Sequence, residues 1–172
     1  IEQEKKLPET VLMFLGDGEL KEEIRKQAME MGISSRVLFL GNKRDVHRYY
    51  QAMDYFLLPS FYEGLPGTAI EAQPSGLPGI LSDSVTEEAV VTNLLQMRSV
   101  KEEPILWAKE IMAESRNYGN GTDKFWEAGD TVNEQKLLTE KRGSYAEIVR
   151  QASFDVKVQA EKMEKFYQTG RF

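Results

Sequence analysis

The first hundred residues of the chain alternate between short apolar runs and stretches with helical periodicity. Near-continuous apolar runs are typical of strands in a parallel sheet, because helices cover both faces of such a sheet. Strands and helices that alternate at this spacing predict an α/β fold, a Rossmann-like, doubly wound parallel sheet with right-handed connections. The predicted strands cover residues 10–16, 36–41, 55–60, 77–82 and 90–97.

Amphipathic stretches lie between these runs. Residues 18–32 place Leu20, Ile24, Ala28 and Met31 on one helical face, and a glycine follows as a helix stop. The pattern becomes predominantly helical beyond residue 100, which predicts C-terminal helices after the sheet. The further predicted helices cover residues 44–53, a stretch from Thr68 to the stop at Pro74 and Gly76, and residues 102–115, 141–151 and 154–170.

Length and composition limit the function. A chain of 172 residues can form one compact domain with its own core, so we expect a single domain over residues 1–172. The net charge of −6 argues against a nucleic-acid partner. The absence of cysteine excludes disulfides, thiol catalysis and Cys-ligated zinc, and the single histidine, His47, argues against a His-based metal site or a Ser-His-Asp triad. No run approaches the ~18 apolar residues of a spanning helix, and we expect a cytoplasmic protein.

The stretch PSFYEGLPGTAIEAQPSGLP, residues 59–78, places two glutamates around a glycine-rich turn. Glu63 follows a predicted strand, at the edge of a parallel sheet where ligands bind. Glu71 lies in the predicted helix, whose first turn offers free N–H groups to an anion, and the glycines permit close approach of a ligand. A carboxylate beside a bound diphosphate would accept hydrogen bonds from sugar hydroxyls. The pattern therefore favours a sugar–diphosphate–nucleoside, with one glutamate at the sugar and the other at a ribose.

A purely structural interpretation competes with this one at Glu71. Thr68 and Glu71 have the spacing of a capping box, in which Thr68 is the N-cap and Glu71 the third helical residue. Such a cap contributes only ~1 kcal/mol. It explains Glu71 as well as a ligand does, but it gives no reason for Glu63.

Three segments together resemble the C-terminal half of the group 1 glycosyltransferases (glycosyltransferase family 4): FLGDGEL, VLFLGNKRDVHRYYQAMDYFLLPSFYEGLPGTAIEAQPSGLP and FDVKVQAEKMEKFY. The resemblance runs from about residue 11 to residue 98 and returns near residues 154–167. Its most specific part is the pair of glutamates eight positions apart. Members of this family are retaining enzymes of the GT-B type, built from two facing Rossmann-like domains, and the sequence is most similar to bacterial enzymes that build capsular or exopolysaccharide.

The resemblance implies a role for each site residue. Glu63 would be the catalytic glutamate, holding the hydroxyls of the donor sugar, and Glu71 would bind the ribose. The backbone of residues 64–68 would surround the sugar and diphosphate, and Gly41 with Asn42 would flank the nucleobase. The donor-binding residues implied in this way are Gly16, Gly41, Asn42, Gly64, Leu65, Pro66, Gly67, Thr68 and Glu71.

The resemblance also implies substrates and partners. The full enzyme would transfer a hexose from a UDP-sugar, with retention, to a glycan or lipid-linked acceptor, and it would contact the inner membrane face peripherally. No metal and no cofactor besides the donor are expected, and self-association is left open. The acceptor domain and the first donor-domain strand of the family would lie outside residues 1–172, so we expect this chain alone to be inactive.

Other interpretations remain open on the sequence. The chain would alternatively be a non-catalytic Rossmann-like module that binds nucleotide or a protein partner, with Glu71 as a cap. A nucleotide-sugar epimerase ranks third, because its acid/base residues are not recognisable. Where the family has bulkier apolar residues, this chain has Gly67, Thr68, Ala69 and Gly79, which predicts looser packing under the site.

Overall fold

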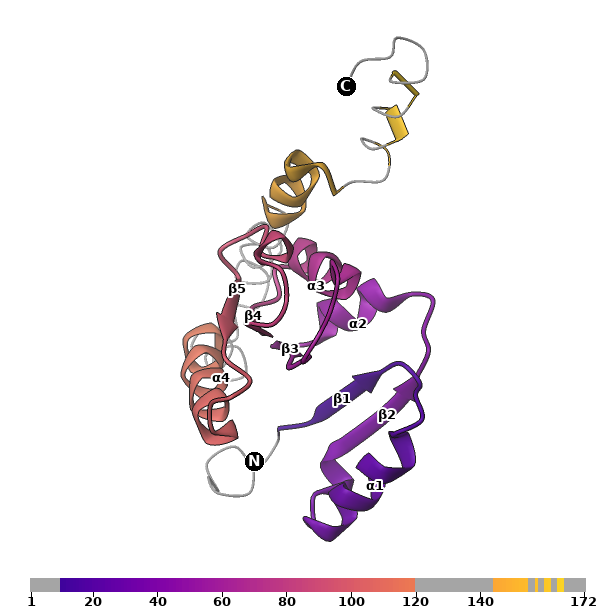
Figure 1. The fold of residues 1–172 in the computed structure, drawn as a ribbon, viewed down its shortest axis with the longest axis vertical. Coiled ribbons are helices and arrows are strands. Elements are labelled where there is room, and N and C mark those ends of the chain that lie inside the picture. Colours follow the sequence, from indigo (N-terminus) through magenta and orange to yellow (C-terminus); the bar gives the residue numbers. More distant parts are fainter. Residues whose placement is uncertain (1–9, 120–143, 155–156, 158–159, 162–163, 166–172) are drawn as a thin grey trace, which may run out of the picture. The chain divides into compact units, whose positions relative to one another are not determined.

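The computed structural model describes residues 10–119, 144–154, 157, 160–161 and 164–165. Strands and helices alternate along residues 12–119, and every strand pairing is parallel (Figure 1). These features confirm the predicted α/β class. The chain divides into two compact units, Ile1–Val46 and His47–Phe172, each of which is described by itself. The prediction of a single domain over residues 1–172 stays a prediction.

The first unit is a β-α-β arrangement. β1 (Leu12–Leu15) and β2 (Val37–Gly41) pair in parallel, and α1 (Lys21–Glu30) connects them. Apolar side chains of the three elements form a small core. Its buried residues include Ala28 of α1 and Val37 of β2, the rings of Phe14 and Phe39 stack with centroids 5.2 Å apart, and the Arg25 guanidinium lies 4.9 Å from the Phe39 ring centroid.

The second unit contains a three-stranded parallel sheet in the order β3-β4-β5, formed by Phe56–Leu58, Gly79–Ser82 and Leu95–Arg98. Every residue of the central strand β4 is buried, as expected for a strand with neighbours on both edges and helices on both faces. In Figure 1, α3 and α4 lie on opposite sides of this sheet. The helices of the unit are α2 (Val46–Ala52, which begins at the last residue of the first unit), α3 (Gly67–Ala72, continued by a 3₁₀ turn over Gln73–Ser75) and α4 (Pro104–Gly119).

Polar side chains attach α4 to the sheet. The Glu114 carboxylate accepts hydrogen bonds from the Tyr55 hydroxyl, at 2.7 Å, and from the Gln96 amide of β5. Near the other end of α4 the buried Trp107 indole N–H donates to the Ser99 carbonyl at 3.0 Å, as expected for a core residue. Arg98, the last residue of β5, pairs with Glu102, which precedes α4, and with Glu110 within α4, so the strand and the helix are also joined by charge.

The predicted elements begin or end within a few residues of the observed ones, with one larger difference. β5 covers only Leu95–Arg98, because a 3₁₀ turn at Glu87–Ala89 and irregular backbone precede it, whereas the prediction began at residue 90. Residues 144–149 are helical and Arg150–Phe154 form a π-helix, within the helix predicted at 141–151 and just beyond it. Most of the helix predicted at 154–170 lies outside the described residues. None of the helices within the described residues is long and apolar enough to cross a membrane.

The looser packing predicted at Gly79 is wrong. A Cβ atom at this position would lie 2.6 Å from the Phe56 carbonyl oxygen, 2.8 Å from the Phe56 Cβ and 3.1 Å from a methyl carbon of Leu95. Phe56 and Leu95 pair with Gly79 on the two adjacent strands. The backbone at Gly79 is therefore packed so closely between its two neighbouring strands that there is no room for a side chain.

Candidate functional site

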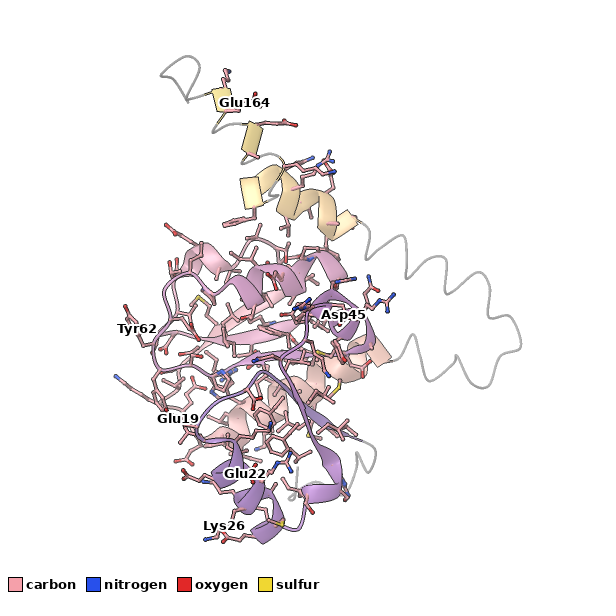
Figure 2. The ribbon with its side chains drawn as sticks, turned by 90° about the vertical axis from the view of Figure 1, so that its right-hand side faces the viewer. Glu19, Glu22, Lys26, Asp45, Tyr62 and Glu164 are labelled. Atoms are coloured by element: carbon pink, nitrogen blue, oxygen red, sulfur yellow. The ribbon has the colours of Figure 1, made fainter. Side chains whose placement is uncertain are left out.

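The loop after β3 carries the first candidate residue, Glu63. The Ser60 hydroxyl donates to Oε1 of Glu63 at 2.9 Å, and both residues are half-buried. Between them, Phe61 and Tyr62 are 81% and 86% exposed, and Figure 2 shows the Tyr62 side chain pointing away from its loop. The loop therefore holds the carboxylate of Glu63 in place while it leaves two aromatic rings in water.

The capping box predicted for Thr68 and Glu71 is wrong. α3 begins at Gly67, Pro66 is its N-cap, and no side chain caps the helix. The Pro66 carbonyl instead accepts from the amides of Ala69 and Ile70, at 3.1 and 3.4 Å. The extended backbone of Pro66 starts the helix two residues earlier than the box requires, so Glu71 is the fifth helical residue. The structural explanation for Glu71 is thereby removed.

Glu71 is exposed on α3, with its charge close to the buried Tyr50 of α2. Burial, and secondarily the negative charge of Glu71, raise the pKa of the Tyr50 hydroxyl to about 12. The Tyr50 ring packs edge-to-face on Phe56 of β3, with ring centroids 6.1 Å apart. Beneath Glu71, α2 and β3 are therefore joined by an apolar contact between Tyr50 and Phe56. In this buried place the Tyr50 hydroxyl keeps its proton.

We expect the stability of the second unit to fall between about pH 10 and pH 12, because the unfolded chain loses the Tyr50 proton first. A tyrosine has a pKa of about 10 when unfolded, so the folded state binds more protons over this interval and unfolding becomes easier as the pH rises. Two pKa units correspond to a loss of roughly 2–3 kcal/mol. Urea unfolding at several pH values should show this slope in the wild-type chain and not in Tyr50→Phe. Equal slopes in the two proteins would contradict the assignment.

Three predicted donor-binding residues lie together in the first unit. The Gly16 amide donates to the Gly41 carbonyl at 3.0 Å, which joins the carboxyl ends of β1 and β2. Both glycines have positive φ, +133° and +68°, and a side chain in either place would strain the backbone. Asn42 follows directly and is exposed. The strand ends thus place Gly16, Gly41 and Asn42 next to one another, and their role in donor binding stays a prediction.

The other predicted site residues lie in the loop and first helix that follow β3. Pro66 is buried, whereas Gly64, Leu65, Gly67 and Thr68 are exposed. A Cβ atom at Gly64 or Gly67 would meet no atom within 4 Å, so the protein's own packing does not require a glycine there. Whether these residues bind a donor stays a prediction.

Two neighbours of the site are missing from the sequence-based set. Ser60 touches Glu63 directly, and its position three residues before Glu63 was the only available signal. Gln73, fully buried at the end of α3, gave no signal, because most of its hydrogen-bond partners lie sixteen or more residues later in the chain. Within the residues that the structure describes, no group of three or more metal-ligating side chains occurs.

The chain is similar to curated glycosyltransferases over short segments. It is 45% identical over 101 residues to EpsF of Bacillus subtilis, a protein named as a glycosyltransferase, and 48% identical over 73 residues to the Vi polysaccharide biosynthesis protein VipC/TviE of Salmonella typhi. It is 36% identical over 88 residues to the UDP-Gal:alpha-D-GlcNAc-diphosphoundecaprenol alpha-1,3-galactosyltransferase of Escherichia coli. These matches cover 58%, 42% and 51% of this chain, but only 26%, 13% and 23% of the relatives.

Solved structures share the fold. Sucrose-phosphate synthase of Thermosynechococcus elongatus matches 93% of this chain and 38% of its own, with a TM-score of 0.58 and 22% identity. HepE of Anabaena, solved in complex with UDP, matches 94% of this chain and 42% of its own, with a TM-score of 0.59 and 20% identity. At such identities the likeness shows the GT-B type of α/β fold alone.

The family follows from the sequence itself. A profile of the family described as glycosyl transferases group 1 matches residues 1–113, which include β1 to β5 and both glutamates. Of the relatives named above, one is named for polysaccharide biosynthesis and one for galactosyl transfer to a diphosphoundecaprenol-linked sugar. The chain belongs to the group 1 glycosyl transferases.

Proposed function

We propose that this chain is the donor-binding part of a retaining glycosyltransferase that moves a hexose from a UDP-sugar to a glycan or a lipid-linked acceptor. The observation that carries the proposal is the Glu63 carboxylate, which Ser60 holds at the end of β3, beside the glycine-containing start of α3. Two similarities support the nature of the ligands. The Escherichia coli relative is named for a UDP-galactose donor and a diphosphoundecaprenol-linked acceptor, and the Anabaena neighbour was solved with UDP.

The residues of the loop and helix suit the parts of such a donor. The carboxylate of Glu63 accepts hydrogen bonds, and the hydroxyls of a sugar donate them. The amides of Gly67 and Thr68 precede Ala69, whose amide is the first of α3 to donate to the Pro66 carbonyl, and they are assigned to the donor diphosphate. Glu71, exposed and freed from a capping role, is assigned to the ribose hydroxyls.

The chemistry proposed for the full enzyme needs little from these side chains. The bond between the anomeric carbon and the diphosphate oxygen breaks, and the acceptor oxygen forms its bond to the same face of that carbon. The acceptor proton passes to the departing diphosphate, so neither glutamate is required to carry it. The protein contributes fixed hydrogen-bond donors and acceptors around the separating charges. We propose no metal and no cofactor other than the donor.

The acceptor side is proposed for the whole protein and not for the residues that the structure describes. Because the matched segments span about a quarter or less of the curated relatives, turnover, the acceptor and any peripheral contact with the inner membrane face are proposals for the whole protein. Donor binding is the part of the proposal that can be measured with this chain.

Glu63→Gln is expected to weaken binding of a UDP-sugar about tenfold and to leave binding of UDP within about twofold, because only the sugar hydroxyls lose a charged acceptor. Calorimetric or ligand-observed NMR titration of the 172-residue chain measures both affinities. The ligands are UDP and three UDP-sugars that carry glucose, galactose or N-acetylglucosamine. Glu103→Gln, at an exposed glutamate next to α4, is the matched control and should change neither affinity.

Two outcomes would count against the proposal in different ways. An equal loss of affinity for UDP and for the UDP-sugars would contradict a contact between Glu63 and the sugar, and would indicate that Glu63 contacts the nucleotide. Wild-type affinities that do not depend on the sugar would favour the alternative of a non-catalytic nucleotide-binding module.

A further inference from the structure

Ser60 makes the one side-chain hydrogen bond to Glu63 that the described part of the chain shows. Its hydroxyl donates to Oε1 of the carboxylate at 2.9 Å, across a separation of three residues. Ser60 follows β3 after a single proline, and β3 pairs with the buried central strand β4. The donor of this hydrogen bond is thus attached, through Pro59, to the three-stranded sheet of the second unit.

The bond does not serve the packing of the loop. The two residues that it brackets, Phe61 and Tyr62, are the most exposed large apolar residues of the described chain, at 81% and 86%. A hydrogen bond that stabilised the loop for folding would be expected to bury these rings, because burial of an aromatic side chain is a large favourable term. What the bond fixes is the carboxylate itself.

The bond leaves most of the carboxylate available to a ligand. An ionised carboxylate has about four acceptor positions on its two oxygens, and the Ser60 hydroxyl occupies one of them, on Oε1. Oε2 and the second position on Oε1 remain for donors from outside the chain. A free glutamate would have to order its side chain when a ligand binds, whereas this one is already oriented.

We propose that Ser60 is a positioning residue, whose hydroxyl presents the Glu63 carboxylate to the hydroxyls of the donor sugar. The inference rests on the proposed function, since it assigns the same sugar to Glu63. It adds that recognition of the sugar depends on a side chain that does not touch the sugar.

The test compares Ser60→Ala with Ser60→Thr in the 172-residue chain. Ser60→Ala should weaken binding of the preferred UDP-sugar about three- to tenfold, because the carboxylate must now be ordered by the ligand. Binding of UDP should stay within about twofold of the wild type, and Ser60→Thr, which keeps a hydroxyl on the same carbon, should restore sugar binding. Melting curves of both variants establish that the chains are folded.

A double variant separates positioning from a general loosening of the loop. In the Glu63→Gln background, Ser60→Ala should cause little further loss of sugar binding, because the charged group that it orients is gone. Losses that simply multiply would show that Ser60 acts independently of Glu63, and would overturn the inference.

The same titrations distinguish this inference from the proposed function. If the wild-type chain prefers a UDP-sugar, Glu63→Gln removes the preference and Ser60→Ala keeps it, then the role of Ser60 is overturned and the proposed function stands. If the wild-type chain shows no dependence on the sugar, the proposed function fails and the donor role of Ser60 fails with it. NMR relaxation of the Tyr62, Glu63 and Gly64 amides then shows whether Ser60 restricts the motion of the loop around Glu63. Ser60→Ala should increase their mobility and Ser60→Thr should not, and unchanged mobility would overturn positioning itself.

Discussion

Gly79→Ala is expected to lower the free energy of unfolding of the second unit by about 3 kcal/mol or more, the upper range for overpacking a core. The added methyl group would lie 2.6 Å from the Phe56 carbonyl oxygen and 2.8 Å from the Phe56 Cβ. Neither is the flexible end of a side chain, so relief requires β3 to move away from β4. That movement would increase the distance between β3 and β4 at the pair formed by Phe56 and Gly79. Urea unfolding followed by circular dichroism measures the loss.

A second glycine offers a matched control for this effect. Gly67 is the first residue of α3, and a Cβ atom there would meet no atom within 4 Å. Gly67→Ala should therefore leave the free energy of unfolding within about 1 kcal/mol of the wild type, or raise it, because alanine is the better helix former. Similar stabilities for Gly79→Ala and the wild type would show that β3 and β4 are held less tightly than their distances indicate.

The strand order of the second unit also makes Gly79→Ala informative about the site. β3 leads directly into the loop that carries Ser60 and Glu63. A displacement of β3 would carry both residues with it. We expect sugar-dependent binding to be lost in any fraction of Gly79→Ala that remains folded.

The elements of the sheet were predictable because each apolar run is short and is bounded by glycine, proline or charge. β1, β2, β3 and β4 each lie within a predicted strand, and the segment after β3 contains both glutamates at the position expected for a ligand site. Such signals are local, since a strand buried on both faces is apolar at nearly every position. The family resemblance then added the family itself, which the match over residues 1–113 confirms.

The failures have physical reasons that local patterns do not contain. The spacing of Thr68 and Glu71 fits a capping box, but the extended Pro66 begins the helix two residues earlier and its carbonyl accepts the first amides. The glycine at position 79 suggests a gap, whereas its neighbours on two other strands, Phe56 and Leu95, leave no space to fill. In both places the outcome depends on atoms that the local pattern does not specify.

Gln73 is the clearest example of a residue whose role is invisible in the sequence. It follows Glu71 and Ala72 and precedes Pro74, a context typical of a polar residue at the exposed end of a helix. Its side chain is fully buried and all of its hydrogen-bonding groups have partners. The amide nitrogen donates to the carbonyls of Ala69 and Ala89, at 3.0 and 2.9 Å. The amide oxygen accepts from the Val91 and Thr92 amides and from the Thr92 hydroxyl, at 3.0, 2.8 and 2.9 Å.

Gln73→Leu is expected to lower the free energy of unfolding by about 3–5 kcal/mol, because it leaves several buried polar groups without partners. The hydrogen bonds of Gln73 connect the end of α3 to the segment that leads into β5, so their loss also releases α3. Glu71 lies two residues before Gln73 on that helix, and donor binding should weaken together with stability. Gln27→Leu, at an exposed glutamine of α1 with a single long hydrogen bond to Glu23, is the control and should change stability by less than about 0.5 kcal/mol.

Gln73→Glu tests the same site with almost no change in shape. The introduced carboxyl would keep the three interactions that the amide oxygen accepts, but its second oxygen would face the carbonyl oxygens of Ala69 and Ala89. Burial and these oxygens favour its protonated form, which can donate to one of the carbonyls, so its pKa in the folded chain should lie above that in the unfolded chain. The folded state then binds more protons, and the stability deficit relative to the wild type should grow as the pH rises from about 4 to 7. A deficit that is the same at both pH values would mean that water reaches Gln73, and that α3 is held by packing rather than by this set of hydrogen bonds.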